Sequence, residues 1–175
     1  LAVFLSFLGH RNRALDAYHQ MAQDRPRTLN AGYANFNAAR LAFRIEGPSL
    51  QRLNEAKGAR ALIAKRSGEA SVTSLNRTLA KMISELGQAD EAKAQLQALE
   101  KDAARQGDAM LQLYVRRQLL FDGEGDTAGK SSDADYEKML ASYRDLGIRR
   151  GVPFVYREYA FYLARSERLS EALVM

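Results

Sequence analysis

The 175-residue sequence contains no cysteine. The chain can therefore form no disulfide framework, no thiolate metal site and no cysteine nucleophile. Such an absence is typical of proteins kept in a reducing compartment, and we expect a cytoplasmic protein. Proline is also scarce, with three residues in the chain, so long helices can run without a break.

A membrane-spanning segment is absent from the sequence as well. The most apolar stretch, residues 1–8, falls short of the roughly 18 consecutive apolar residues that a transmembrane helix needs. It also lacks the basic leader and the cleavage site of a signal peptide. We therefore expect no association with a membrane.

Residues that favour helices dominate the composition. Apolar residues make up 46% of the chain, which is enough for one sizeable core and argues against disorder. Long stretches consist of alanine, leucine, arginine, glutamine, glutamate and lysine, which lose least on entering a helix. The alternation of β-branched and aromatic residues that is typical of strands is missing. The composition predicts a single all-α domain over residues 1–175.

Three short segments of the chain resemble one another, and each contains an alanine at a fixed offset from a turn. These alanines, Ala14, Ala92 and Ala172, recur at nearly equal intervals of 78 and 80. The spacing predicts a repeat of about 40 residues, with one less obvious copy in each gap. Twelve positions before each of them stands another alanine, which follows a large apolar residue. Small residues at these positions let two antiparallel helices approach closely, and the large residues fill the space to the next pair.

The copies in the two gaps are predicted from turn residues and helical patterns. Gly47-Pro48-Ser49 separates two helices in the first gap, and an inserted loop over 122–132 separates two helices in the second. The predicted helices of the two gaps span 29–45, 49–66, 108–121 and 133–147. Altogether the sequence predicts about four and a half helix pairs.

This pattern resembles the tetratricopeptide repeat, and Tyr18 and Pro26, four and twelve positions after Ala14, extend the resemblance. The resemblance implies an α-α superhelix, a solenoid of antiparallel helix pairs that binds proteins or peptides. The long period is similar to that of arrays in large bacterial transcription activators of the maltose-regulator type and in peptide-sensing signalling proteins. Half-a-tetratricopeptide and other α-solenoid repeats remain as alternatives. Both ends interrupt a repeat, so we expect a segment of a longer protein, in which open repeat ends allow self-association.

One row of polar residues follows the same period. Asn37, Arg77, Arg117 and Arg157 recur at intervals of 40, and Lys81, Phe121 and Phe161 lie four positions after the three arginines. The resemblance implies that the first helices of the pairs line a concave groove. We expect these seven residues to bind an acidic protein or peptide, because arginine forms strong charge-assisted bonds with carboxylates. The alternative is that they are ordinary solvated residues.

The charge of the chain is unevenly distributed. The net charge is +5, of which residues 1–67 contribute +7 and residues 68–175 contribute −2. A second hypothesis is therefore that the basic third binds nucleic acid or another acidic surface. The arginines that this hypothesis uses are notably Arg11, Arg13, Arg25, Arg27, Arg40 and Arg44. We favour a protein partner, because aromatic residues are not interleaved with these charges as in RNA-binding modules.

Three sequence patterns resemble ligand-binding motifs, but each lacks a feature that its motif requires. Residues 123–131 look like a phosphate-binding loop, but Glu124 occupies the position of its first glycine, and no strand precedes it. Asp122, Glu124 and Asp126 are spaced like the start of a calcium loop, but the glycine and the distal glutamate of that motif are out of place. His10 and His19 lack the spacing of a zinc site. We expect no cofactor, no metal and no enzymatic activity.

Overall fold

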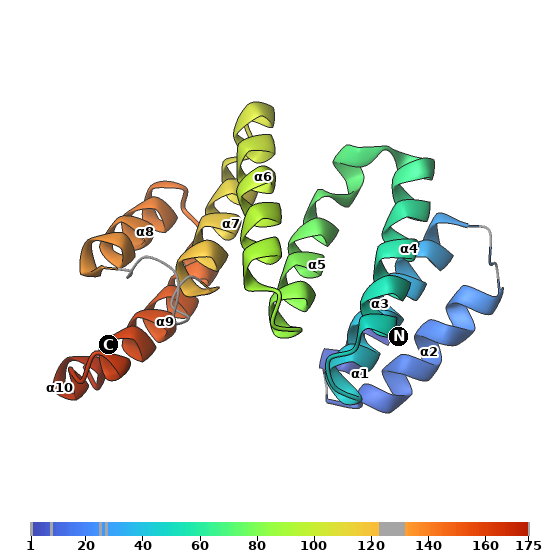
Figure 1. The fold of residues 1–175 in the computed structure, drawn as a ribbon, viewed down its shortest axis with the longest axis horizontal. Helices are drawn as coiled ribbons and strands as arrows, with labels where there is room; N and C mark the ends of the chain where they lie inside the picture. The colour runs from blue at the N-terminus through green and yellow to red at the C-terminus, as the bar shows by residue number, and fades with distance from the viewer. Residues whose placement is uncertain (1, 8, 25, 27, 123–131, 175) are drawn as a thin grey trace. The chain divides into compact units, whose positions relative to one another are not determined.

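The computed structural model describes residues 2–7, 9–24, 26, 28–122 and 132–174. In this part of the chain the secondary structure is entirely helical and includes no strand, which confirms the all-α class (Figure 1). None of the described helices is long and apolar enough to cross a membrane. The predicted loop 122–132 lies largely outside the described residues.

The helices are α1 (Ala2–Phe7), α2 (Arg11–Asp24), α3 (Leu29–Ile45), α4 (Leu50–Ser67), α5 (Thr73–Glu85), α6 (Ala89–Gln106), α7 (Ala109–Asp122), α8 (Asp133–Asp145), α9 (Val152–Arg165) and α10 (Leu169–Ala172). Two short 3₁₀ helices, η1 (Glu69–Val72) and η2 (Arg149–Gly151), lead into α5 and α9. The helices predicted for the two gaps agree closely with α3, α4, α7 and α8 at both ends.

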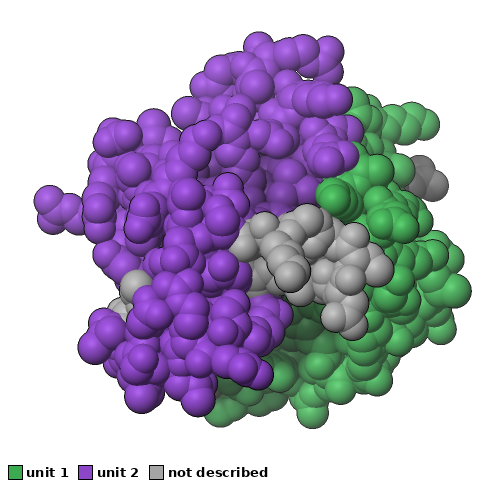
Figure 2. All heavy atoms as spheres, turned by 60° about the vertical axis from the view of Figure 1, so that its left-hand side comes forward, with its two compact units in different colours: residues 1–95 green, residues 96–175 purple. Residues whose placement is uncertain are grey.

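The chain forms two compact units, residues 1–95 and 96–175, which are coloured separately in Figure 2. The division falls within α6. We predicted one domain over the whole chain and describe each unit here by itself. In the first unit α1 packs on α2, α2 on α3, α3 on α4 and α4 on α5, and in the second α7 packs on α8, α8 on α9 and α9 on α10.

Helices begin at regular intervals along the chain. The segments α3, η1, α7 and η2 begin at positions 29, 69, 109 and 149, which is a constant interval of 40. The turns follow nearly the same interval, 39 or 40 residues or a multiple of it. Backbone positions in the left-handed region stand after α3, α5 and α9 at Gly47, Gly87 and Glu167, and before η1, α7 and η2 at Gly68, Gly107 and Gly147. The period found in the sequence is therefore also a period of secondary structure.

Side chains cap several helices. The hydroxyl of Thr28 accepts a hydrogen bond from the amide of Ala31 at 3.2 Å at the start of α3. Ser132 and Asp135 form a reciprocal capping box at the start of α8, in which each side chain accepts from the backbone amide of the other residue. Such contacts satisfy amides that the first turn of a helix leaves without partners.

The first unit buries its small residues as the repeat predicts. Ala14, Ala80 and Ala92 are at most 2% exposed. Phe36 and Phe43 of α3 fill the core between α3 and α4, where they pack among Leu53 and other apolar residues. Close approach of the helices here depends on side chains that add little volume.

The second unit has a core rich in tyrosine. The rings of Tyr136 on α8 and Tyr159 on α9 are stacked, with centroids 4.8 Å apart and planes 10° from parallel. Tyr143 is completely buried and packs against Gly151. Ala160, which we expected to be a buried small residue, is only half-buried.

Candidate partner-binding surface

The predicted row lies on alternate helices. Asn37 is on α3, Arg77 and Lys81 are on α5, Arg117 and Phe121 are on α7, and Arg157 and Phe161 are on α9. The row is therefore divided between the two compact units, with Asn37, Arg77 and Lys81 in the first and the other four in the second.

In the first unit the predicted residues contact their own helices. The side-chain amide of Asn37 donates to the carbonyl oxygen of Tyr33 at 3.0 Å, one turn earlier in α3. The ammonium of Lys81 lies 3.8 Å from a carboxylate oxygen of Glu85, also one turn away. Arg77 is half-buried. These contacts leave the ammonium of Lys81 largely in solvent, because its side chain is 54% exposed.

In the second unit two predicted arginines converge on one aromatic ring. The guanidinium carbons of Arg117 and Arg157 lie 5.3 Å and 5.5 Å from the centroid of Phe154. Both distances are within the range of cation–π attraction. The ring thus joins an arginine of α7 to an arginine of α9, and we call Arg117, Phe154, Arg157 and Glu158 the α7–α9 cluster.

Glu158 is the buried member of this cluster, with 6% of its surface exposed. Its two carboxylate oxygens lie 3.8 Å from Nε of Arg117 and 3.9 Å from Nη2 of Arg157. A buried carboxylate is tolerated when cations compensate it. Two guanidiniums face one carboxylate, so the α7–α9 cluster has a net charge of +1.

The two arginines of the cluster differ in exposure. The Arg117 side chain is 21% exposed, and its buried Nε has no hydrogen-bond partner in the described part of the chain. The Arg157 side chain is 60% exposed and can present its guanidinium to a ligand without prior rearrangement. Arg157 is therefore the more accessible of the two cations.

The two helices of the cluster carry three exposed phenylalanines, one of which is Phe154 itself. Phe121, Phe154 and Phe161 are 39%, 49% and 55% exposed, whereas Phe36 and Phe43 of the first unit are 1% exposed. Large exposed apolar side chains gathered on neighbouring elements are typical of interaction surfaces. We refer to the α7–α9 cluster together with Phe121 and Phe161 as the α7–α9 surface.

Sequence reasoning missed Phe154 and Glu158. Both could have been found, because Phe154 precedes Arg157 by three positions and Glu158 by four, and residues at these spacings share a face of a helix. The period of the repeat did not reveal them, because the equivalent positions 114 and 118 hold tyrosine and glutamine.

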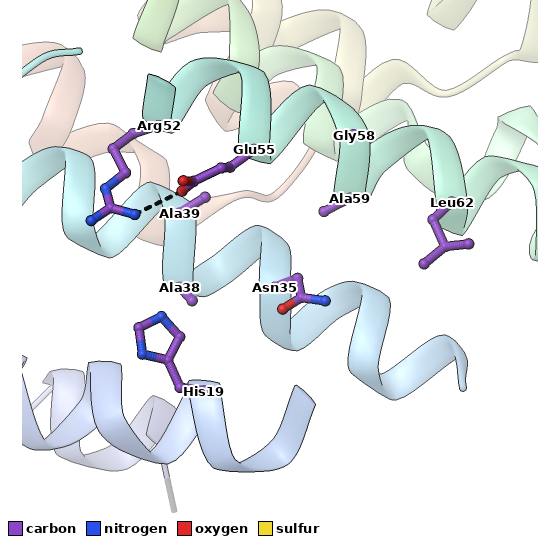
Figure 3. A pocket seen from close by; sticks show the side chains of 9 residues that line it. All are labelled: His19, Asn35, Ala38, Ala39, Arg52, Glu55, Gly58, Ala59 and Leu62. Atoms are coloured by element: carbon purple, nitrogen blue, oxygen red, sulfur yellow. Dashed lines mark hydrogen bonds and ion pairs between the residues drawn. The ribbon is translucent and has the colours of Figure 1, made fainter. Parts of the chain in front are cut away.

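A concave feature lies in the first unit, between α2, α3 and α4, and we call it the α2–α4 groove (Figure 3). Its volume is about 460 Å³. His19 of α2 stands on one side, Ala38 and Asn35 of α3 lie at the floor, and α4 forms the other side (Figure 3). The lining residues of α4 are Arg52, Glu55, Gly58, Ala59 and Leu62.

Ion pairs fix one end of this groove. Arg52 Nη1 donates to Glu55 at 2.8 Å, and Nη2 donates to Glu46 at 2.8 Å. The hydrogen bond from Arg52 holds the pKa of Glu55 below its usual value, and His19 adds a small effect in the same direction. The side chains of Glu46 and Glu55 remain 48% and 39% exposed, so both carboxylates can still be reached from solvent.

The arginines of the basic third differ in exposure among the residues described. Arg11, Arg13 and Arg44 are exposed, while Arg40 is half-buried. Burial lowers the pKa of Arg40, and the neighbouring charge of Arg44 lowers it further. Arg25 and Arg27 lie outside the described residues.

The described residues also contain no group of three or more side chains that could hold a metal ion. Residues 123–131, which look like a phosphate-binding loop and overlap the calcium-loop pattern, lie outside them. No known family model matches the chain, and a comparison with curated proteins gives no match.

Proposed function

We propose that this chain is a non-catalytic binding module that holds an acidic segment of another protein on its α7–α9 surface. The observation behind this proposal is the pair of guanidiniums on the exposed ring of Phe154, with a net positive charge and two more exposed phenylalanines, Phe121 and Phe161, on the same two helices. Arginine at such a site binds carboxylates through strong, charge-assisted hydrogen bonds. Rigid aromatic side chains add contact area at a low cost in conformational entropy.

The proposal includes the architecture that the sequence resembles. Helical segments that begin at a constant interval, and pack on their sequence neighbours within each unit, are compatible with a tetratricopeptide-like solenoid. In that architecture the alternate helices α7 and α9 would contribute to one binding face. We place the module in a larger regulatory or signalling protein, as the long period of the repeat suggests.

The experiment uses a fluorescently labelled peptide of alternating glutamate and leucine, and the same peptide with lysine in place of glutamate. We expect the acidic peptide to raise the anisotropy at lower protein concentration than the basic one. Arg157→Ala should weaken its binding roughly tenfold, which corresponds to one charged hydrogen bond. Equal binding of the two peptides would contradict the proposal.

Arg116→Ala is the matched control. Arg116 stands next to Arg117 on α7, but its Nε donates to Glu100 at 2.6 Å, a carboxylate that does not belong to the cluster. The substitution removes the same charge from the same unit, so a loss as large as that of Arg157→Ala would show that only net charge matters. Labelled duplex DNA in the same assay tests the second hypothesis, since phosphate contacts give a steep dependence on salt.

A further inference from the structure

The α2–α4 groove lies where the repeat elsewhere has large side chains. Because the helical segments begin at a constant interval of 40, side chains separated by that interval occupy equivalent positions. Asn35, at the floor of the groove, is equivalent to Leu75, Val115 and Val155. Val115 and Val155 are completely buried, whereas Asn35 is exposed.

Two more lining residues differ from their equivalents, and both of these are truncated to alanine. Ala39 is equivalent to Leu79, Leu119 and Tyr159. Ala59, on α4, is equivalent to Leu99 and Met139, which are 4% and 8% exposed. The groove is thus a space in which two large apolar side chains of the repeat are replaced by alanine and a third by the polar Asn35.

This space is large enough for an aromatic side chain. Its volume of about 460 Å³ is within the range of pockets that hold small organic ligands. Gly58 contributes an open position on α4, because a Cβ added there would meet no atom within 4 Å. An aromatic ring from a partner could replace the apolar volume that the other repeats supply themselves.

The rim of the groove has the charge opposite to that of the α7–α9 cluster. Arg52 is bound by the two carboxylates of Glu46 and Glu55, so this group has a net charge of −1. In the cluster, Arg117 and Arg157 face the single carboxylate of Glu158, with a net charge of +1. The chain therefore offers a groove with two carboxylates at one end on one unit, and basic helices with exposed phenylalanines on the other.

We propose that the α2–α4 groove of one molecule receives Phe161 of a second copy, with Arg157 of that copy beside Glu46 and Glu55. Phe161 is the most exposed phenylalanine described, and Arg157 stands one helical turn before it on α9. The proposal rests on the proposed function, because it assigns a partner to the α7–α9 surface. The contact joins two different surfaces, so association is heterologous.

The test is complementation between two variants, measured by sedimentation velocity and light scattering. Gly58→Leu fills the groove and leaves Phe161 in place, while Phe161→Ser removes the ring and leaves the groove open. The wild-type chain should form dimers or larger species as its concentration rises roughly a hundredfold. Each variant alone should remain monomeric, and an equal mixture should form dimers and nothing larger, because only one pair of surfaces is intact.

Two matched controls accompany the variants. Gly58→Ala adds a single methyl group in open space and should associate like the wild type. Met110→Ser removes another exposed apolar side chain of α7, 51% exposed, and should also associate normally. Restoration of dimers in the mixture excludes misfolding as the reason why each variant alone is monomeric.

The inference is overturned if the wild-type chain stays monomeric at the highest concentration, if Gly58→Leu associates like the wild type, or if the mixture fails to form dimers. Binding of the acidic peptide distinguishes failure of this inference from failure of the proposed function. Gly58→Leu should bind that peptide as well as the wild type does, because the substitution is far along the chain from α7 and α9. Peptide binding without self-association would overturn this inference alone, and loss of both would overturn the two together.

Discussion

The ring of Tyr143 lies so close to the backbone of Gly151 that a Cβ on residue 151 would stand 1.8 Å from the Cε1 atom of the tyrosine. The φ angle of Gly151 is −80°, so any residue could adopt this backbone conformation. Glycine is required here by space alone. The buried ring and the missing side chain together let η2 and α9 pack against α8.

Gly151→Ala should destabilise the second unit through overpacking, by about 1–3 kcal/mol or more. Thermal unfolding followed by circular dichroism measures the loss. Gly58→Ala is the control, since its Cβ meets no atom and alanine favours the helix by about 0.5–1 kcal/mol. A Gly151→Ala protein as stable as the wild type would show that Tyr143 can move aside freely.

Ala92→Leu should destabilise the first unit by roughly 1–3 kcal/mol, because Ala92 is 2% exposed and packs in a core with Leu79 and Ile83. Ala94→Leu, two positions on and exposed, should have little effect. Urea unfolding of both variants gives the comparison. Equal losses at the two positions would mean that the small residues of the repeat do not set the distance between helices.

The left-handed turns predict that two substitutions change stability in opposite directions. Gly87→Ala should destabilise the chain by about 1–2 kcal/mol, since φ is +81° at that position. Glu167→Gly should instead be neutral or stabilising, because glutamate is already strained at φ +61°. Melting temperatures test both. A stabilising Gly87→Ala would contradict the geometry of the turn.

The α8 capping box predicts a dependence on pH. Hydrogen bonds from the side chain and backbone of Ser132 lower the pKa of Asp135 from its usual 3.8. A carboxyl whose pKa is depressed by folding adds stability that is present above pH 3.8 and is lost as the pH falls through the folded value. The wild type should therefore exceed Asp135→Asn in stability at neutral pH, and the difference should shrink in acid. A difference that stays constant down to about pH 2 would contradict this assignment.

The α7–α9 cluster predicts coupled effects on binding. Arg157→Ala should leave the free energy of unfolding nearly unchanged, since the Arg157 side chain is 60% exposed and Arg117 still faces the carboxylate of Glu158. Phe154→Ala should weaken binding of the acidic peptide as well, and the double variant should lose less than the sum of the two, because the ring orients the guanidinium. A double-mutant cycle by anisotropy checks this. Strict additivity would show that the two side chains act independently.

Much of the local structure could be predicted from the sequence. The helix predicted over 29–45 coincides with α3, because Thr28 caps its start and Gly47 follows its end. The candidate site was predicted only in part. The period of the sequence predicts Arg117 and Arg157. Their convergence on the ring of Phe154 depends on how α7 and α9 lie in the folded unit. The period does not give the distance from either guanidinium to that ring.

The α2–α4 groove was missed for a different reason. Its signal is present in the sequence, as Asn35, Ala39 and Ala59 at positions where other repeats have larger apolar residues. A search for shared features overlooks residues that differ between copies. The departures become informative only when the structure shows that the three positions face one space.

Within each unit the helices pack on their neighbours in sequence, and this has a kinetic consequence. Contacts between adjacent helices close only short loops, so little chain entropy is lost before packing begins. Proteins with such local contacts fold in microseconds to milliseconds, far faster than sheets assembled from distant strands. Each unit should accordingly recover its structure quickly after being pulled or pushed open.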